Sequence, residues 1–343
     1  MKIAVIGGGV VGLSATVELA RRGVDVVCYE PGPPMGERSA GDTRIFRLAH
    51  AYPDMVDLAA QSRRLFAGWS ERAGEPLIDE VGTVVSGELV GDWASAMAMS
   101  GADHQLVDPG SSLLRLPATD FAGPALIDPA GGIIRADRVR AFLTAAAANH
   151  IRQTSADTIE EIKDARVRVT AGTSVDDFDA ALICAGSATS GLAAGVGIGT
   201  PSALEHHVRF SFPLRVDTPL QCWITDGTYQ HVAAPGTWSI GADADPALVS
   251  WEGGREAAER ASLDVVTAYV ARELPGVEPR AVGRLYCTHN PDLGDGLQFV
   301  RRGRVLAVHG ENLFKFAPLL GNWLAQACVD GSTPGDAGPG RAA

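Results

Sequence analysis

The chain of 343 residues carries 29 Lys and Arg against 41 Asp and Glu, a formal net charge of −12 at pH 7. Nucleic acid is therefore not an expected partner, because phosphate binding requires clustered Lys and Arg. No apolar run reaches the roughly 18 residues needed to cross a bilayer, and no basic region with a small-residue cleavage site suggests a signal peptide. We expect a cytoplasmic globular protein that does not bind membranes. Its length predicts two closely joined domains.

The first motif follows the apolar run at residues 2–6. Gly7, Gly9 and Gly12 form a G-x-G-x-x-G pattern between a predicted strand and an amphipathic helix. Such a turn lets the backbone approach a pyrophosphate at a helix N-terminus, where N–H groups and the helix dipole favour negative charge. Glu30 ends the next apolar run, close to the spacing of about 20 residues at which an acid binds an adenosine ribose. The segment predicts a dinucleotide site.

The rest of the chain alternates irregularly between helical and strand-like segments. Helical periodicity predicts helices over residues 55–73, 136–149, 255–273 and 316–329. Short apolar runs predict strands over residues 81–86, 125–127, 167–170, 178–186, 208–214 and 231–233. No repeat or low-complexity linker divides the sequence, so the second domain is expected to be inserted in pieces.

The order of these segments favours FAD over NAD. A nicotinamide dehydrogenase would continue alternating strands and helices to about residue 150, whereas this chain enters PGPPMGERSAGDTR and returns to sheet strands only near Asp179. We expect an α/β fold with a glutathione-reductase-type, Rossmann-like FAD-binding domain and an interleaved α+β substrate domain on a mainly antiparallel sheet. The predicted FAD-binding domain comprises residues 1–78, 133–203 and 293–343, and the substrate domain comprises residues 79–132 and 204–292.

Three motifs carry a resemblance to a known family. They are GDTRIFR at 41–47, FDAALICAGSATSGL at 178–192 and HGENLFKFAP at 309–318. In order and spacing they resemble segments of the monomeric sarcosine oxidase and N-methyltryptophan oxidase family, within the D-amino-acid-oxidase-like superfamily. The resemblance covers nearly the whole chain and implies an FAD-dependent enzyme that oxidises amines.

The resemblance also implies roles for single residues. Arg44 would lie beside the isoalloxazine ring, and Arg47 with Lys315 would hold a substrate carboxylate. A guanidinium fork matches a carboxylate, and an ammonium adds a second point charge. The alternatives for the two arginines are a solvated loop or a structural ion pair with Asp42, and the alternative for Lys315 is a snorkelling side chain. The residues implied to bind the cofactor are Gly7, Gly9, Gly12, Glu30, Arg38, Thr43, Arg44, Gly186, Gly310, Asn312, Leu313 and Lys315.

The sequence departs from the family pattern at four places. Ser239 replaces a lysine associated with oxygen activation, and Asp243 replaces a histidine; both remain candidate catalytic residues. A cation stabilises superoxide as it forms, so we expect slow reaction with oxygen. Glu311 lies where a negative charge would oppose the reduced flavin. Cys287 lies off the register of the family's FAD-tethering cysteine, so non-covalent FAD is expected.

No metal site is predicted. The five cysteines include no C-x-x-C pair, and His206 and His207 are adjacent on a predicted strand, so their side chains should face opposite sides. The aromatic residues Trp223, Tyr229, Trp238 and Trp251 are candidates either for a substrate pocket or for the core.

The main functional hypothesis is hydride transfer to flavin N5 from a small amino or imino acid that carries a carboxylate, with release of an imine. Oxygen or another acceptor would then take the electrons. One alternative is a dehydrogenase or specialised biosynthetic flavoenzyme that reacts poorly with oxygen, as Ser239, Asp243 and Glu311 suggest. A second alternative is a flavin-binding protein without catalysis.

Overall fold

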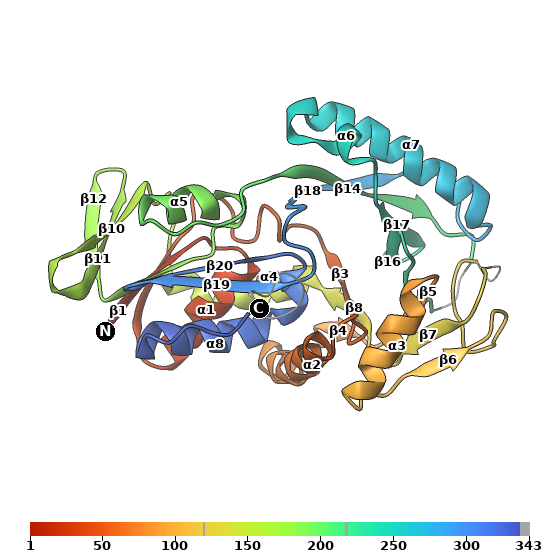
Figure 1. Cartoon of the computed structure of the whole chain (residues 1–343), viewed down its shortest axis with the longest axis horizontal. Helices are drawn as coiled ribbons and strands as arrows, with labels where there is room; N and C mark the ends of the chain where they lie inside the picture. Colours follow the sequence, from red (N-terminus) through yellow and green to blue (C-terminus); the bar gives the residue numbers. More distant parts are fainter. Residues whose placement is uncertain (119–120, 217–218, 337–343) are drawn as a thin grey trace. The chain divides into compact units, whose positions relative to one another are not determined.

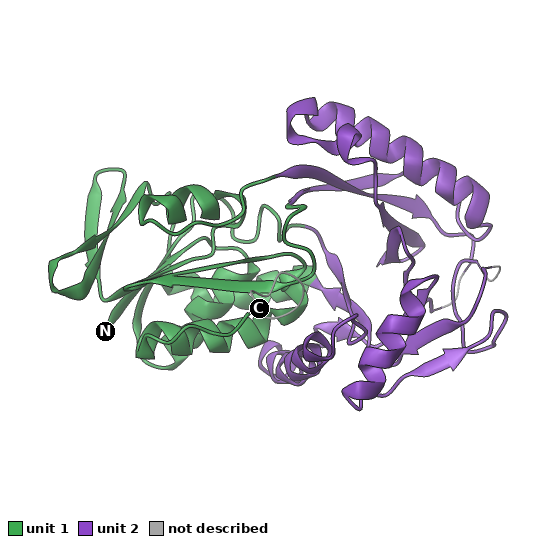
Figure 2. Ribbon diagram, in the orientation of Figure 1, with its two compact units in different colours: residues 1–40, 136–203, 290–343 green, residues 41–135, 204–289 purple. Residues whose placement is uncertain are grey.

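A computed structural model describes residues 1–118, 121–216 and 219–336. The chain forms two compact units (Figure 2): unit 1 comprises segments 1–40, 136–203 and 290–343, and unit 2 comprises segments 41–135 and 204–289. Residues 41–78, assigned with the FAD-binding segments in the sequence-based division, thus group with unit 2. The assignment of FAD and substrate to particular segments remains a prediction.

Unit 1 is built on a six-stranded sheet of order β19-β20-β13-β1-β2-β9. Figure 1 labels β1, β19 and β20 of this sheet. In that order the strands are Leu297–Arg302, Val305–Gly310, Ala180–Ile183, Lys2–Ile6, Asp25–Tyr29 and Ile151–Arg152. All neighbours are parallel except β19, which runs antiparallel to β20. Strand β13 is buried along its whole length, as is typical of a parallel strand covered on both faces.

The helices of unit 1 come from distant parts of the chain. Helix α1 (Val10–Arg21) contacts both α4 (Ala136–Ala147) and α8 (Ala317–Asp330), while α5 (Thr189–Gly195) contacts β13 and β20. An antiparallel meander adds strands β10 (Thr158–Ile162), β11 (Arg166–Ala171) and β12 (Ser174–Phe178). The predicted strand, glycine turn, helix and strand are β1, α1 and β2, so the expected α/β class is confirmed.

Unit 2 contains an eight-stranded sheet of order β18-β14-β17-β16-β15-β5-β7-β6. In that order the strands are Gly283–His289, Glu205–Pro213, Thr237–Ala242, Thr228–Ala234, Cys222–Ile224, Thr83–Ser86, Ala125–Asp128 and Gln105–Val107. Neighbours are antiparallel except β15 and β5. The mainly antiparallel sheet expected from the sequence is confirmed.

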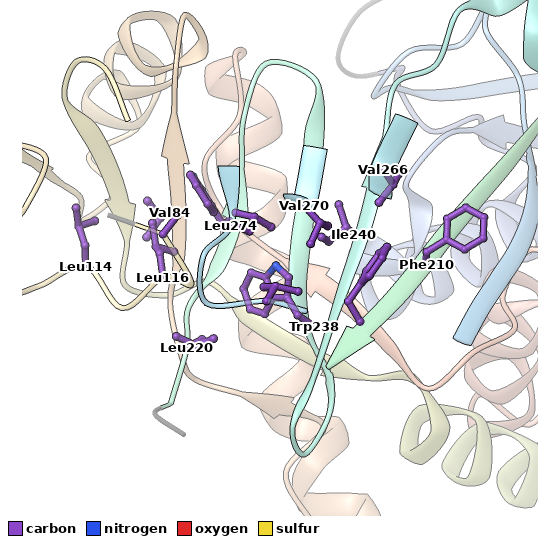
Figure 3. Close-up of a cluster of buried hydrophobic side chains, with 14 of the residues drawn as sticks. Val84, Leu114, Leu116, Phe210, Leu220, Trp238, Ile240, Val266, Val270 and Leu274 are labelled. Atoms are coloured by element: carbon purple, nitrogen blue, oxygen red, sulfur yellow. The ribbon is translucent and has the colours of Figure 1, made fainter. Parts of the chain in front are cut away.

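One face of this sheet packs against α7 (Arg255–Glu273), which follows the short α6 (Pro246–Val249). The side chains of this packing include Phe210, Trp238, Ile240, Val266 and Val270 (Figure 3). Phe212 belongs to the same cluster. Alternate residues of a strand point to opposite faces, so the residues between them lie on the other side. We call this second side the polar face; it comprises His207, Arg209, Tyr229, His231, Ser239 and Gly241.

The register brings the polar-face residues together. Gly241 of β17 pairs with Arg209 of β14 on one side and with Tyr229 of β16 on the other. Ser239 pairs in the same way with His231. Cross-strand partners share a face, so these side chains form one continuous surface.

A smaller sheet of order β3-β8-β4 carries the GDTRIFR segment. Its strands are Thr43–Phe46, Gly132–Arg135 and Ile78–Asp79, and β3 also contacts β16. Helix α2 (Pro53–Ala73) contacts α3 (Leu89–Met99). Arg44 therefore lies within a strand and Arg47 directly follows it, rather than both lying in a solvated loop.

The long helices predicted from periodicity are confirmed, and α7 has both predicted ends. The expectation that sheet strands return only near Asp179 is wrong, because Ile151–Arg152 already pairs with β2 in the parallel sheet. Two residues are too few to give a periodic signal. Within the described parts of the chain, no helix is both long enough and apolar enough to cross a membrane.

Candidate functional site

The glycine turn between β1 and α1 is closely packed at two of its three glycines. Gly7 has a φ of 106°, and a Cβ built on it would lie 2.5 Å from the Cys184 carbonyl oxygen. A Cβ built on Gly12 would lie 1.9 Å from the carbonyl oxygen of Gly7. Glycine is needed at both positions because the backbone segments leave no room for a side chain.

Gly9 differs from its two neighbours in the motif. Within the described structure, a Cβ built on Gly9 would meet one atom inside 4 Å outside its chain neighbours, the Ser39 Oγ at 3.4 Å. The open space lies at the N-terminus of the twelve-residue helix α1, where a phosphate is favoured by the helix dipole and N–H groups. The turn therefore fits the pyrophosphate of FAD.

The Glu30 carboxylate is fixed at the end of β2. It accepts hydrogen bonds from the backbone N–H groups of Gly8 at 2.7 Å and Gly32 at 2.8 Å. An ionised carboxylate has about four acceptor sites, so these two bonds leave capacity for hydroxyl groups. The ribose role of Glu30 remains a prediction that this geometry allows.

Glu311 is compensated within unit 1. Its carboxylate is paired with the Arg38 guanidinium and accepts a hydrogen bond from the Asn290 N–H at 2.9 Å, and the residue is 7% exposed. Arg38 also lies beside Gly186, 3.8 Å from a Cβ built there. The negative charge of Glu311 is therefore balanced by the positive charge of Arg38, so it would oppose a reduced flavin less than an unpaired carboxylate would.

Lys315 lies in a short 3-10 helix, Leu313–Phe316, that leads directly into α8. Gly310 ends β20, and Asn312 between them adopts a left-handed conformation with φ 56°. The Lys315 side chain is 4% exposed, its Nζ lies 3.2 Å from Asp295 Oδ1, and it lies over the Phe316 ring. Lys315 is thus buried and ion-paired, which does not match the snorkelling alternative.

Arg47 is held at the end of the GDTRIFR segment by three groups. Its Nη1 donates to the Ala49 carbonyl and lies 2.8 Å from His50 Nδ1, and its guanidinium carbon lies 4.5 Å from the centre of the Trp93 ring. Stacking on an aromatic face restrains the plane of a guanidinium. Helix α3 thereby positions Arg47.

Thr43 links β3 to the polar face. Arg44 Nη1 donates to the Thr43 carbonyl at 2.8 Å, and Arg209 Nη2 donates to the same oxygen at 3.2 Å. His231 Nε2 lies 2.9 Å from Thr43 Oγ1. Two guanidinium groups therefore converge on one peptide group.

This convergence shifts several protonation equilibria. Burial, and then the charge of Arg209, lowers the pKa of Arg44 to about 10. Burial also lowers the pKa of Arg209. The pKa of His231 lies well below its ordinary value because of burial and because Arg209, Arg44 and Arg135 repel a further positive charge. His231 is therefore neutral, while positive charge concentrates on the two arginines.

Asp243 follows β17 at the edge of the polar face. Burial raises the pKa of the Asp243 carboxyl, and the charge of His289 opposes that shift. Cys287 on β18 pairs with His207 in the register and is a half-buried thiol that forms no disulfide. Whether Cys287 tethers FAD remains open to the chemical test described below.

The predicted site residues are distributed over both units. Unit 1 contains Gly7, Gly9, Gly12, Glu30, Arg38, Gly186, Gly310, Asn312, Leu313 and Lys315, and unit 2 contains Thr43, Arg44, Arg47, Ser239 and Asp243. The structure adds Arg209 and His231, which the sequence interpretation missed. Their signal was the alternation in HHVRFSF and in YQHVA, where polar residues at every second position mark one strand face.

The remaining candidates have structural positions. Trp223 and Trp238 belong to the hydrophobic core of unit 2, whereas Trp251 is 48% exposed and stacks on His206. His206 and His207 have different partners, as expected for opposite strand faces. Among the described residues, no group of three or more His, Cys, Asp or Glu side chains could hold a metal ion.

Comparisons with known proteins agree with this architecture. The sequence model of a family described as FAD dependent oxidoreductase matches residues 2–327. No curated protein sequence matches the chain. Solved structures with the same fold include NikD, described as an unusual amino acid oxidase essential for nikkomycin biosynthesis, with 20% identity, coverage of 96% of this chain and 94% of that chain, and a TM-score of 0.82.

Two further structures are similar. Glycine oxidase from Geobacillus kaustophilus has 21% identity and a TM-score of 0.76, with coverage of 95% of this chain and 94% of that chain. Iminodiacetate oxidase from Chelativorans sp. BNC1 has 17% identity and a TM-score of 0.78, with coverage of 96% and 95%. At these identities the likeness establishes the fold.

Proposed function

Since the chain belongs to the family of FAD dependent oxidoreductases, we propose that it oxidises a C–N bond of a small amino or imino acid and releases an imine. Bound FAD supplies the acceptor for the hydride. The residues of the chain would bind the substrate carboxylate, orient the carbon that loses hydride and accept the amine proton. Glycine oxidase and iminodiacetate oxidase, which share the fold, are named for substrates of this class.

The observation that carries the proposal is the restrained guanidinium of Arg47. Its guanidinium lies over the Trp93 ring and donates to the Ala49 carbonyl, so these contacts hold the group before a ligand arrives. A preorganised guanidinium suits bidentate recognition of a carboxylate. Arg47 would anchor the acid end of the substrate, and the family resemblance implies Lys315 as a second cation for it.

The test is an anaerobic titration of the purified holoenzyme with N-methyl and cyclic amino acids. The readout is the absorbance of the flavin near its maxima in the visible range. Bleaching by an amino acid, and none by the matching amine without a carboxylate, is the expected result. If no amine bleaches the flavin, the chain would instead be a flavin-binding protein without this catalysis.

Ser239 favours a second candidate, a dehydrogenase with a different electron acceptor. Ser239 is 1% exposed and uncharged on the polar face, so it cannot supply the positive charge that stabilises superoxide. Turnover with a redox dye would then exceed turnover with oxygen. Equal rates with both acceptors would point to an oxidase in which Arg44 or Arg209 provides the charge.

FAD is proposed to bind without a covalent link. Acid precipitation should release the flavin into the supernatant. Flavin that stays with the pellet of wild type, but not with that of Cys287→Ser, would establish a link to Cys287.

A further inference from the structure

Strand β14 carries two adjacent histidines, and each pairs with a tyrosine of another strand on its own face of the sheet. On the face covered by α7, His206 Nδ1 lies 2.8 Å from the Tyr286 hydroxyl. On the polar face, His207 Nε2 lies 2.5 Å from the Tyr229 hydroxyl. The two pairs use the same chemical groups, so they provide an internal comparison.

The pair formed by His206 and Tyr286 packs against neighbouring side chains. The His206 ring stacks on Trp251 at a centroid distance of 4.8 Å, and the Arg255 guanidinium lies 3.9 Å from the centre of the Tyr286 ring. Tyr286 packs against the hydrophobic core of unit 2. This pair therefore has a structural role.

The pair on the polar face has different neighbours. The Tyr229 ring occupies the space above Gly241, where a Cβ would lie 2.1 Å from Tyr229 Cζ. The charged and titratable groups around Tyr229 are Arg44 from β3, Arg209 from β14, Asp243 after β17 and Cys287 from β18; Asp42, which precedes β3, acts on both arginines. The hydroxyl thus lies among the groups already singled out on the polar face.

Further titratable groups lie near this hydroxyl and closer to solvent. The His207 and His289 rings are 6.1 Å apart, and His289 acts electrostatically on Asp243. Tyr229, His207 and His289 are all half-buried, and Asp243 is exposed. Two further titratable side chains, His289 and Asp243, therefore lie near this pair, and the second of them is exposed.

We propose that Tyr229 and His207 together remove the proton that an ammonium substrate must lose before hydride can leave the adjacent carbon. The Tyr229 oxygen accepts the proton as the N–H bond breaks, and the Tyr229 O–H proton passes to Nε2 of neutral His207. The nitrogen keeps the electron pair, which becomes the second bond of the imine when hydride departs. His289 and Asp243 lead the proton to solvent. This assignment rests on the proposed function.

The protonation state of Tyr229 supports the relay. Burial raises the pKa of Tyr229, although Arg209 and Arg44 act in the opposite direction. A neutral phenol can accept one proton while it donates another, whereas a phenolate would hold the proton that it captured. His207 must present an unprotonated Nε2 in this state.

The experiment measures the rate of anaerobic flavin reduction by an amino-acid substrate from pH 6 to pH 11 in five proteins. These are wild type, Tyr229→Phe, His207→Gln, and the matched controls Tyr286→Phe and His206→Gln. An alkylammonium has a pKa of about 10, so below that pH the relay must remove the proton. We expect a loss of roughly tenfold or more at pH 7 in the Tyr229 and His207 variants, and convergence with wild type at the highest pH. Neither control should alter the shape of the profile.

A second readout does not depend on turnover. In NMR titrations of the imidazole nitrogens of the holoenzyme, Tyr229→Phe should shift the His207 resonances and Tyr286→Phe should not. If wild type is bleached by amines but all five pH profiles have the same shape, the relay is wrong and the proposed function stands. If no amine bleaches wild type, both fall. A His207 titration unchanged by Tyr229→Phe would also overturn the relay.

Discussion

The main sheets of the two units differ in how they present functional groups. In unit 1 the central strands β1, β13 and β20 of the mainly parallel sheet are largely buried, and the candidate ligand-binding groups lie in the turns and loops that follow strands, such as Gly9 after β1 and Glu30 after β2. In unit 2 the antiparallel sheet is apolar on the side of α7 and polar on the other, so functional side chains lie within the strands themselves. Candidate ligand-binding turns are therefore local in unit 1, whereas the polar face is assembled from separate strands.

The largest predicted effects concern the glycine turn between β1 and α1, where one glycine is expected to serve FAD binding and another to serve backbone packing. Gly9→Val should leave the fold intact but abolish FAD binding, because its side chain would fill the space open to the pyrophosphate. Gly12→Ala should destabilise the protein itself, since its Cβ would clash with the Gly7 carbonyl. Flavin absorbance per chain and the thermal midpoint of unfolding distinguish the two variants. Full flavin occupancy in a folded Gly9→Val would show that the turn does not hold FAD.

The next largest effect is expected at the buried ion pair of unit 1, between Arg38 and Glu311, and it concerns the stability of the fold. Arg38→Met leaves the buried Glu311 carboxylate without its cation and should cost about 3 kcal/mol in the free energy of unfolding. The double variant Arg38→Met, Glu311→Leu should recover most of that loss, because no buried charge remains unpaired. Denaturant unfolding of the four proteins gives the coupling energy. A double variant as unstable as the sum of the single variants would exclude the pairing.

The proposed carboxylate clamp predicts a similar loss of affinity when either of its cations, Arg47 of unit 2 or Lys315 of unit 1, is removed. Arg47→Met or Lys315→Met should weaken a carboxylate inhibitor by about 1.5–3 kcal/mol, roughly one to two decades in affinity, with FAD still bound. Arg47→Lys should restore binding only partly, because an ammonium lacks the fork. Titration of the inhibitor against flavin absorbance measures this. Arg63→Met is the control, since Arg63 also lies over an aromatic ring, Phe46; unchanged affinity in both Arg47 variants would contradict the clamp.

The smallest effect concerns the polar face at low pH. His231 has a folded-state pKa below its ordinary value, so the unfolded chain binds the proton more readily. Stability should therefore fall as pH drops below about 6.5, by up to ~1.4 kcal/mol per pH unit from this residue. His231→Gln should flatten that decline in a series of urea unfolding curves. The same slope in both proteins would mean that His231 is not held neutral.

Sequence analysis predicted unit 1 better than unit 2 for a physical reason. The glycines and Glu30 act through spacing along a few dozen residues, and that spacing can be read from one segment. The polar face depends on register: Tyr229, Gly241 and Arg209 become neighbours only when β16, β17 and β14 align. Periodicity indicated that His206 and His207 face opposite sides, but not which side would be polar. The pairing of Glu311 with Arg38 was equally hidden, because these residues are far apart in sequence.

The alternation of β14 has a consequence for how the chain reaches its native state. A slip of one residue would turn Phe210 and Phe212 to the polar face and bring Arg209 into the layer beneath α7. An arginine placed there, among Val266 and Val270, would carry a charge with no solvation, which is very unfavourable. Arg209 gives the polar face positive charge. The cost of burying the same guanidinium would also disfavour strand pairings that are shifted by one residue while the sheet forms.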